Sequence, residues 1–303
     1  MKSGKASKRK KIVIKIMRIA IIPTILLFII LSTKSENINH FNADRAYDDV
    51  AYQLSLGPRI IGSSAHDQFI NWAAGELNKA GWEAELQTYS WAGEQLTNII
   101  GTRNSPGNAN SWIILGAHYD SRFIADRDPE ISGQQLPVPG ANDGASGVAI
   151  LLEIARSLPA ETKNNVEIVL FDAEDNGNIP GWEWIIGSRV YVSRLTTIPE
   201  AVVIVDMVGD ADLNLYFERN SDEHLASQIW EVANDLGYHQ FIPEYKHQIL
   251  DDHSPFLEAG IPAVDIIDFD YPYWHTTQDT LDKISPNSLD AVGEVLLAWL
   301  QGY

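Results

Sequence analysis

Four apolar runs separated by helical stretches are the feature that most constrains how this chain folds. The runs occupy 112–118, 166–175, 201–209 and 261–268. A stretch with helical spacing, such as 145–158, lies between neighbouring runs. Apolar strands that alternate with helices are typical of a sheet covered on both faces. The sequence therefore predicts one α/β domain from about residue 40 to the end, with a mixed, mostly parallel central sheet and helices on both of its faces.

Helical spacing or strand alternation indicates five further elements: helices over 43–56, 65–80 and 285–300, and strands over 83–90 and 97–103. Local residues support two of the helix ends. Gly81 suits the position just after a helix, and Ser285 followed by Pro286 suits a helix start.

The N-terminus has the composition of an export segment. Residues 1–18 carry eight Lys or Arg and no acid, and a 13-residue apolar run follows over 19–31. This order predicts a basic cytoplasmic n-region over 1–18, a signal-anchor or signal peptide over 19–34, and a folded domain over 40–303. No small-x-small cleavage site follows, which favours a single-pass anchor in the cell membrane with the domain outside the cytoplasm. Secretion after cleavage, or a buried amphipathic helix in place of an export segment, are the alternatives.

Composition excludes several classes of protein. The 303 residues carry a net charge of -19 despite the basic start. A domain this acidic does not suit nucleic-acid binding, which needs a basic surface. The chain has no cysteine, so it has no disulfide, no thiolate nucleophile and no zinc site built on cysteine. Any metal site uses histidines and carboxylates.

Histidines and carboxylates stand at the ends of the apolar runs or in the loops beside them. The carboxyl ends of parallel strands meet at one edge of a sheet, where ligands bind. We expect five such groups to converge there: His118, Asp143, Asp175, Asp206 and His275. Imidazoles and carboxylates without a thiol suit hydrolytic Zn²⁺. Singly, a histidine can be an ordinary turn residue and Asp143 a helix cap, but a carboxylate such as Asp206 inside an apolar strand is costly unless paired or metal-bound.

The adjacent acids Glu174 and Asp175 are expected to have different roles. Neighbouring residues at a strand end point in opposite directions, so one carboxylate can bind metal while the other faces the substrate. A carboxylate beside a metal is a suitable general base. The alternative is an exposed acidic turn before Asn176 and Gly177.

Five separate motifs resemble those of the M28 zinc peptidases, over roughly residues 45–303. They are AHYDS, GANDGASGVA, the acidic pair, VDMVGD and WHTTQDT. The resemblance implies a zinc aminopeptidase (phosphorylase/hydrolase-like) fold. It implies a zinc on Asp143, Asp175 and His275, and a second, if bound, on His118, Asp206 and bridging Asp143. By the same resemblance Glu174 is the general base and Asp120 orients His118. The chain departs from the family in having Asp175 where a second Glu is usual.

Two activities share this scaffold. M28 aminopeptidases commonly hold two zincs and hydrolyse the first peptide bond, whereas the similar glutaminyl cyclases use one zinc and convert N-terminal glutamine to pyroglutamate with loss of ammonia. Three features resemble the cyclase branch: the insert NGNIPGWEWIIGSR, the segment LDDHSPFLEAGIP with Asp251, and Trp274 before His275. Asp265 departs from animal cyclases, which carry histidine there.

The cyclase interpretation assigns further roles. Trp182 or Trp184, with Trp274, would form an aromatic wall that excludes water. Glu174 would carry a proton from the amine to ammonia, with Asp206 and Asp251 holding it in a carboxylate network. Peptide or protein N-termini are the expected substrates and zinc the cofactor. An inactive ectodomain that binds peptides is a third hypothesis.

Overall fold

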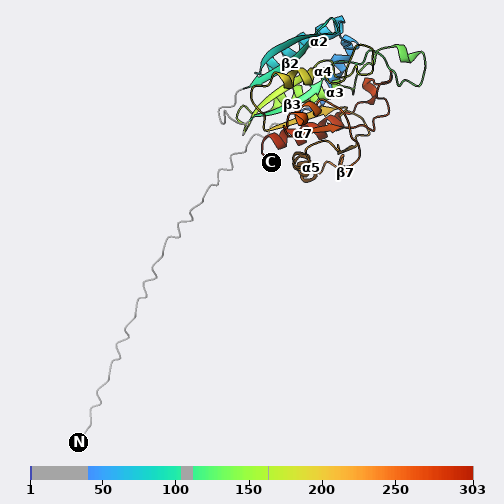
Figure 1. The fold of residues 1–303 in the computed structure, drawn as a ribbon. Coiled ribbons are helices and arrows are strands. Elements are labelled where there is room, and N and C mark those ends of the chain that lie inside the picture. The colour runs from blue at the N-terminus through green and yellow to red at the C-terminus, as the bar shows by residue number, and fades with distance from the viewer. Residues whose placement is uncertain (2–39, 104–111, 163, 303) are drawn as a thin grey trace. The chain divides into compact units, whose positions relative to one another are not determined.

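A computed structural model describes Met1 and residues 40–103, 112–162 and 164–302 (Figure 1). The chain divides into two units, Met1–Ile38 and Asn39–Tyr303, and the second holds the fold. The predicted n-region beyond Met1, and the predicted signal segment over 19–34, lie outside the described residues. In the part of the chain that the structure describes, no helix is both long and apolar enough to cross a membrane.

A six-stranded mixed sheet forms the centre of the domain. β3, β4, β5 and β8 run parallel to their neighbours within the order β4-β3-β5-β8, and β1 and β2 join antiparallel at the β4 edge. This confirms the predicted mixed, mostly parallel sheet. Its strands are β1 (Glu83–Trp91), β2 (Glu94–Arg103), β3 (Trp112–His118), β4 (Asn165–Phe171), β5 (Ala201–Asp206) and β8 (Ala263–Ile267).

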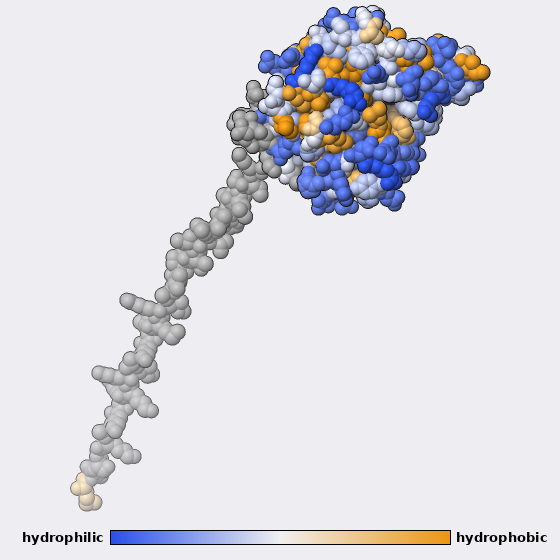
Figure 2. Space-filling view, viewed as in Figure 1, coloured by the Kyte–Doolittle hydropathy of each residue, from blue (hydrophilic) through white to orange (hydrophobic). Residues whose placement is uncertain are grey.

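Helices cover both faces of the sheet, as predicted. The larger apolar core joins one face to five helices: α1 (Ala43–Leu56), α2 (Ser64–Lys79), α3 (Ala145–Ser157), α5 (Glu223–Leu236) and α7 (Pro286–Leu300). A smaller core joins the other face to α4 (Ile186–Ser193) and α6 (Ser254–Glu258). Because β3, β5 and β8 are buried on both sides, their apolar residues form continuous runs. The view in Figure 2 shows a largely hydrophilic outer face with hydrophobic residues scattered over it.

Helix ends follow the local residues. Gly81, one residue beyond the C-cap of α2, has a φ of 84°, a conformation that glycine adopts without a Cβ penalty. The hydroxyl of Ser285 accepts a hydrogen bond from the amide of Asn287 and caps α7, with Pro286 as its first residue. Both predicted helix ends are confirmed.

Two strands are shorter than the apolar runs that predict them. The run over 166–175 contains β4 only as far as Phe171, and the run over 201–209 contains β5 only as far as Asp206. Ala173 and Met207 take positive φ values of 59° and 46°, which end the extended conformation. The acidic pair after β4 therefore lies in a turn and not in a strand.

Two strands beyond the core sheet were not among the predicted segments. β6 (Leu215–Phe217) and β7 (Phe241–Tyr245) pair parallel in a small second sheet. Two short 3₁₀ turns, η1 (Gly133–Gln135) and η2 (Leu281–Lys283), lie in loops of the same domain.

Candidate active site

The carboxyl edge of the parallel strands collects the residues expected there. His118 and Asp206 are the last residues of β3 and β5, and Asp175 lies in the turn after β4. Asp143 precedes α3, and His275 lies in the loop after β8. All five side chains are buried. The rule that strand carboxyl ends meet at one edge thus places them together.

Their ligand atoms form two overlapping clusters. His118, Asp143 and Asp206 make one, and Asp143, Asp175 and His275 make the other, with the ligand atoms of each within 4.8 Å of one another. Oδ1 of Asp143 lies 3.0 Å from Nε2 of His118, while its Oδ2 lies 3.9 Å from Nε2 of His275. Asp143 is therefore the carboxylate shared by both clusters.

The remaining contacts are short. Nε2 of His275 lies 2.8 Å from Oδ1 of Asp175, and Nε2 of His118 lies 3.2 Å from Oδ1 of Asp206. Oδ2 of Asp143 and Oδ2 of Asp175 are buried and have no hydrogen-bond partner among the residues that the structure describes. Such orphaned carboxylate oxygens are costly unless a cation binds them. The donor set, imidazole nitrogens and carboxylate oxygens, fits zinc.

Asp143 does not cap a helix. The N-cap of α3 is Gly144, and no side chain caps this end. A Cβ on Gly144 would stand 2.5 Å from Nε2 of His118, so only glycine allows the helix start to approach the cluster. The capping alternative for Asp143 is thereby excluded.

Burial shifts the titration of the cluster. It raises the pKa of Asp175 to about 6 and that of Asp206 to about 7, in each case against the opposing effect of a histidine. Burial lowers the pKa of His275, but the carboxylates of Asp175 and Asp126 outweigh it and raise this pKa to about 9. A bound cation would displace the proton from His275, because a ligating imidazole must be neutral.

Asp120 contacts more than His118. One of its oxygens lies 3.6 Å from Nδ1 of His118. The same carboxylate accepts hydrogen bonds from the amides of Glu174 and Asp175 at 3.0 and 3.3 Å, and from the side chain of Asn176 at 3.1 Å. Asp120 therefore orders the acidic turn as well as facing the histidine.

Asp126 is a residue that the sequence did not single out. Its Oδ1 lies 3.3 Å from Nδ1 of His275. Arg122 donates two hydrogen bonds of 2.9 Å to the Asp126 carboxylate and a third, of 2.8 Å, to the carbonyl of Asp175. Metal-binding histidines commonly donate their second ring nitrogen to a carboxylate in this way. The spacing of Asp126 along the chain gave no indication that it meets His275.

A cavity of about 210 Å³ opens beside the two clusters. Trp184 and Trp274 line it, as expected, and the ring of Trp184 stacks on His275 with centroids 6.0 Å apart and planes 12° from parallel. Trp182 lies outside the lining and packs edge-on against Phe123 at 5.1 Å. Of the two tryptophans proposed from the insert, the structure thus places only Trp184 at the cavity.

Glu174 and Asp251 also line this cavity. Burial raises the pKa of Glu174 well above its usual value, and the carboxylates of Asp175 and Asp251 raise it further, against the opposing effect of His118. Glu174 belongs to neither cluster of ligand atoms. It lies in the lining of the same cavity as Asp143, Asp175 and Asp206 of the two clusters.

Residues 98–300 match the sequence model of Peptidase family M28. The chain belongs to this family. The crystal structure of Tannerella forsythia glutaminyl cyclase is similar, with 33% identity, 87% of this chain and 99% of that chain covered, and a TM-score of 0.81. So is that of a Zn-dependent exopeptidase from Parabacteroides distasonis, with 32% identity, 88% and 100% covered, and a TM-score of 0.82. A glutaminyl-peptide cyclotransferase of Gloydius blomhoffii is 24% identical over 336 residues, which cover 93% of this chain and 86% of that protein.

These matches confirm the resemblance to the M28 enzymes and establish the chain as an enzyme. Arg59 of this M28 enzyme is a buried residue that lies before the matched region. It donates to the carbonyls of Tyr119 and Gly140 at 2.8 and 2.6 Å. Asp279 accepts from the amide of Asp143 at 3.2 Å. Arg59 and Asp279 together hold the loops that carry the shared aspartate.

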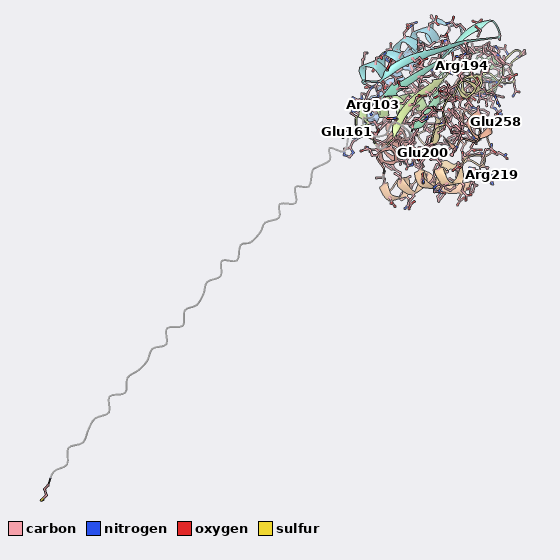
Figure 3. The ribbon with its side chains drawn as sticks, turned by 60° about the vertical axis from the view of Figure 1, so that its left-hand side comes forward. Arg103, Glu161, Arg194, Glu200, Arg219 and Glu258 are labelled. Carbon is pink, nitrogen blue, oxygen red and sulfur yellow. The ribbon has the colours of Figure 1, made fainter. Side chains whose placement is uncertain are left out.

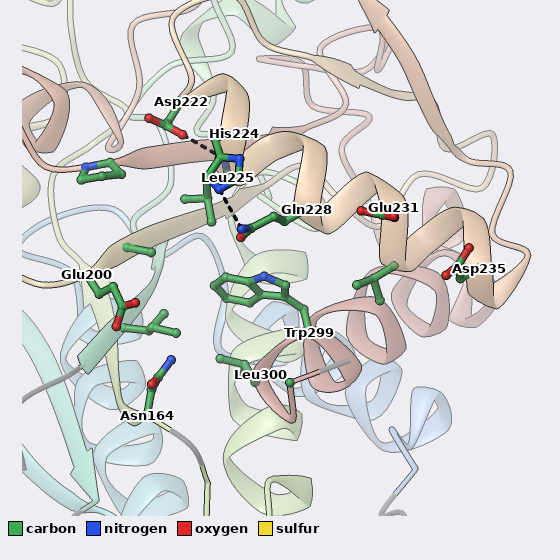
Figure 4. Close-up of a pocket in the computed structure, with 15 residues that line it drawn as sticks. Asn164, Glu200, Asp222, His224, Leu225, Gln228, Glu231, Asp235, Trp299 and Leu300 are labelled. Atoms are coloured by element: carbon green, nitrogen blue, oxygen red, sulfur yellow. Dashed lines mark hydrogen bonds between the residues drawn. The ribbon is translucent and has the colours of Figure 1, made fainter. Parts of the chain in front are cut away.

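A larger hollow, of about 710 Å³, lies away from this edge (Figure 4). Ile113 and Ala201, near the starts of β3 and β5, line it, as does Trp299 of α7. Neither of the two clusters able to hold a metal among the described residues contributes to its lining. In this M28 enzyme the smaller cavity, not the larger one, is therefore the candidate active site.

Proposed function

We propose that this M28 enzyme is a zinc-dependent glutaminyl-peptide cyclotransferase. It would convert the N-terminal glutamine of peptides to pyroglutamate with release of ammonia. The observation that carries the proposal is the small cavity whose aromatic side is made by Trp184 of the 176–189 insert and by Trp274. The similarity to the Tannerella forsythia glutaminyl cyclase supports it.

Asp143, Asp175 and His275 would hold the zinc. When bound, the zinc ion would act as a Lewis acid and polarise the side-chain carbonyl of the substrate glutamine. Asp126 would keep the imidazole of His275 in the orientation and tautomer that binding needs, with its Oδ1 3.3 Å from Nδ1.

Glu174 would carry the proton that the reaction moves. The α-amino nitrogen forms a bond to the side-chain carbonyl carbon, and the bond from that carbon to the amide nitrogen breaks. Glu174 takes a proton from the attacking amine and gives it to the departing nitrogen, which leaves as ammonia. The raised pKa of Glu174 suits a group that must both accept and return a proton. Asp206 and Asp251 complete the carboxylate network around it.

The aromatic side of the cavity would decide between cyclisation and hydrolysis. Trp184 and Trp274 present apolar surface beside the acids. Water held away from the carbonyl cannot compete with the substrate's own amine, which the cavity keeps within reach.

A zinc aminopeptidase is the alternative function. His118 and Asp206 form a second complete cluster with Asp143, as two-zinc hydrolysis would require. The similarity to the Parabacteroides distasonis exopeptidase also favours it. In that case both clusters would be filled, and the first peptide bond would be cut.

We also propose that the domain works outside the cytoplasm. The basic residues 1–18 and the apolar run over 19–31 support an export segment over 19–34, either kept as a membrane anchor or removed on secretion. The catalytic domain would then extend over 40–303.

Mass spectrometry of a glutamine-starting peptide tests the proposed reaction. The zinc-loaded full-length protein should convert it to a product lighter by one ammonia. The control is the same peptide with N-terminal alanine, which cannot cyclise and should stay intact. Release of the first residue from both peptides would instead establish the aminopeptidase. No change in either peptide, at full zinc occupancy, would contradict both activities and favour a peptide-binding ectodomain.

A further inference from the structure

A second hollow adjoins the catalytic cavity. This groove, of about 640 Å³, is lined by Asn220, Gln248, Ile249, Leu250, Ser254, Leu257 and Glu258. Three of its residues, those of segment 248–250, also line the catalytic cavity. A chain that leaves the cavity across this segment therefore enters the groove.

The cavity is too small to hold more than the end of a peptide. Its volume of about 210 Å³ is below the ~300–1,000 Å³ of pockets that enclose whole ligands of drug size. Under the proposed function, the cavity takes the N-terminal residue. The rest of a peptide must leave the cavity, and its extended chain advances by ~3.3–3.6 Å per residue.

Hydrogen bonds to Glu218 and Asn220 hold segment 248–250 in place. Glu218 accepts a hydrogen bond from the amide of Ile249 at 2.9 Å, and Asn220 donates to the carbonyl of Ile249 at 2.9 Å. The side chain of Gln248 donates to that of Asn220 at 2.9 Å. A wall whose conformation is already set binds a chain without paying for its own ordering.

The groove offers apolar surface. The side chain of Leu250 is 51% exposed, and Ile249 and Leu257 are half-buried beside it. At the groove's edge Glu258 pairs with Arg189 at 2.9 Å, and Figure 3 shows Glu258 at the outer surface. Asn220, Gln248 and Ser254 are likewise hydrogen-bonded within the protein. The surface left for a peptide to contact is therefore mainly that of the three apolar side chains.

From these observations we infer that the groove binds the second and third residues of the peptide substrate and prefers apolar side chains there. This inference rests on the proposed function, which places the N-terminal residue in the cavity. When a leucine side chain of the peptide is partly buried against this surface, the affinity for the peptide should rise about fivefold, at ~25 cal/mol per Å² of apolar area buried.

Kinetics on three peptide amides test the inference: Gln-Ala, Gln-Leu-Leu-Ala and Gln-Ser-Ser-Ala. The wild-type protein should show a kcat/KM about fivefold higher for the leucine peptide than for the serine peptide, mainly through KM. Equal values for the two would overturn the inference without any variant.

Two variants locate the effect. In Leu257→Ser the ratio of kcat/KM for the leucine peptide to that for the dipeptide should fall by about fivefold. Leu236→Ser is the matched control, because Leu236 is a 41% exposed leucine that does not line the groove. It should keep the wild-type ratio. An unchanged ratio in Leu257→Ser would also overturn the inference. Failure of the wild-type protein to convert even the dipeptide would instead contradict the proposed function.

Discussion

At the scale of single residues, Asp143 is the centre of the site. Its two oxygens face His118, at the end of β3, and His275, in the loop after β8. These two histidines are far apart in the chain. The sequence predicted its participation, but it left open whether Asp143 only caps α3. The structure decides this, since the cap position belongs to Gly144 and Oδ2 of Asp143 has no hydrogen-bond partner within the described part of the chain.

The clustered histidines and carboxylates, and Asp120 beside them, could be predicted from the sequence, whereas Asp126 and Arg59 could not. His118 ends one apolar run and Asp206 lies within another, and the rule that ligands bind beyond the carboxyl ends of strands identifies both as candidates. Asp126 and Arg59 follow no such rule. Asp126 meets His275 across 149 positions of sequence only because the loop after β3 folds over the loop after β8, as the contact from Asp128 to the amide of Thr277 also shows.

Replacement of Asp126 tests its support of the metal ligand. In Asp126→Asn the ring of His275 loses a negatively charged partner, so the zinc dissociation constant should rise by about 10–100-fold. Competition with a chromogenic chelator measures this constant. Glu130→Gln, an exposed acid of the same loop, is the control and should bind zinc as the wild type does. Unchanged affinity in Asp126→Asn would remove that residue from the metal site.

At the scale of elements, hydrophobic periodicity predicted the strands of the central sheet and four of the five helices of the larger core, but neither α5 nor where the strands end. β4 and β5 end where Ala173 and Met207 turn to positive φ. Nothing in the apolar run marks that bend, because both residues are themselves apolar and buried. The bend lifts Glu174 and Asp175 off the strand and turns them toward the cavity.

The insert after the acidic turn shows the same limit. The tryptophans of the insert predicted an aromatic wall, but the sequence did not show which of the two rings reaches the cavity. Gly177 decides this, because a Cβ there would stand 2.1 Å from the ring of Trp184. The absence of a side chain lets Trp184 lie flat against the turn, and Trp182 packs instead with Phe123.

The N-terminal segment carries a prediction of its own. If residues 19–34 direct export, protease added to intact cells should degrade the domain when it is anchored, and the culture medium should contain it when it is secreted. N-terminal sequencing of the purified protein then separates a retained segment from a cleaved one. A domain that is protected from protease and absent from the medium would contradict the proposed location.

At the scale of the whole molecule, one sheet edge organises the function. The class of fold, the mixed sheet and the coverage of both faces follow from the four apolar runs. The small β6–β7 sheet and the segment 248–250 do not, because they contain short runs with many exposed residues. Segment 248–250 forms one wall of the cavity and of the groove beside it. The sequence therefore predicted the chemistry better than the shape of the substrate site.

The zinc content of three purified full-length proteins tests the central claim, that Asp143, Asp175 and His275 share one ion and Glu174 stands beside it. The measurement is moles of zinc per mole of chain, by elemental mass spectrometry, after identical zinc loading and desalting. We predict that Glu174→Gln retains the wild-type content although its turnover falls by about 10²–10⁴-fold. His275→Ala should lose zinc. Loss of zinc from Glu174→Gln, or full zinc content in His275→Ala, would contradict the account.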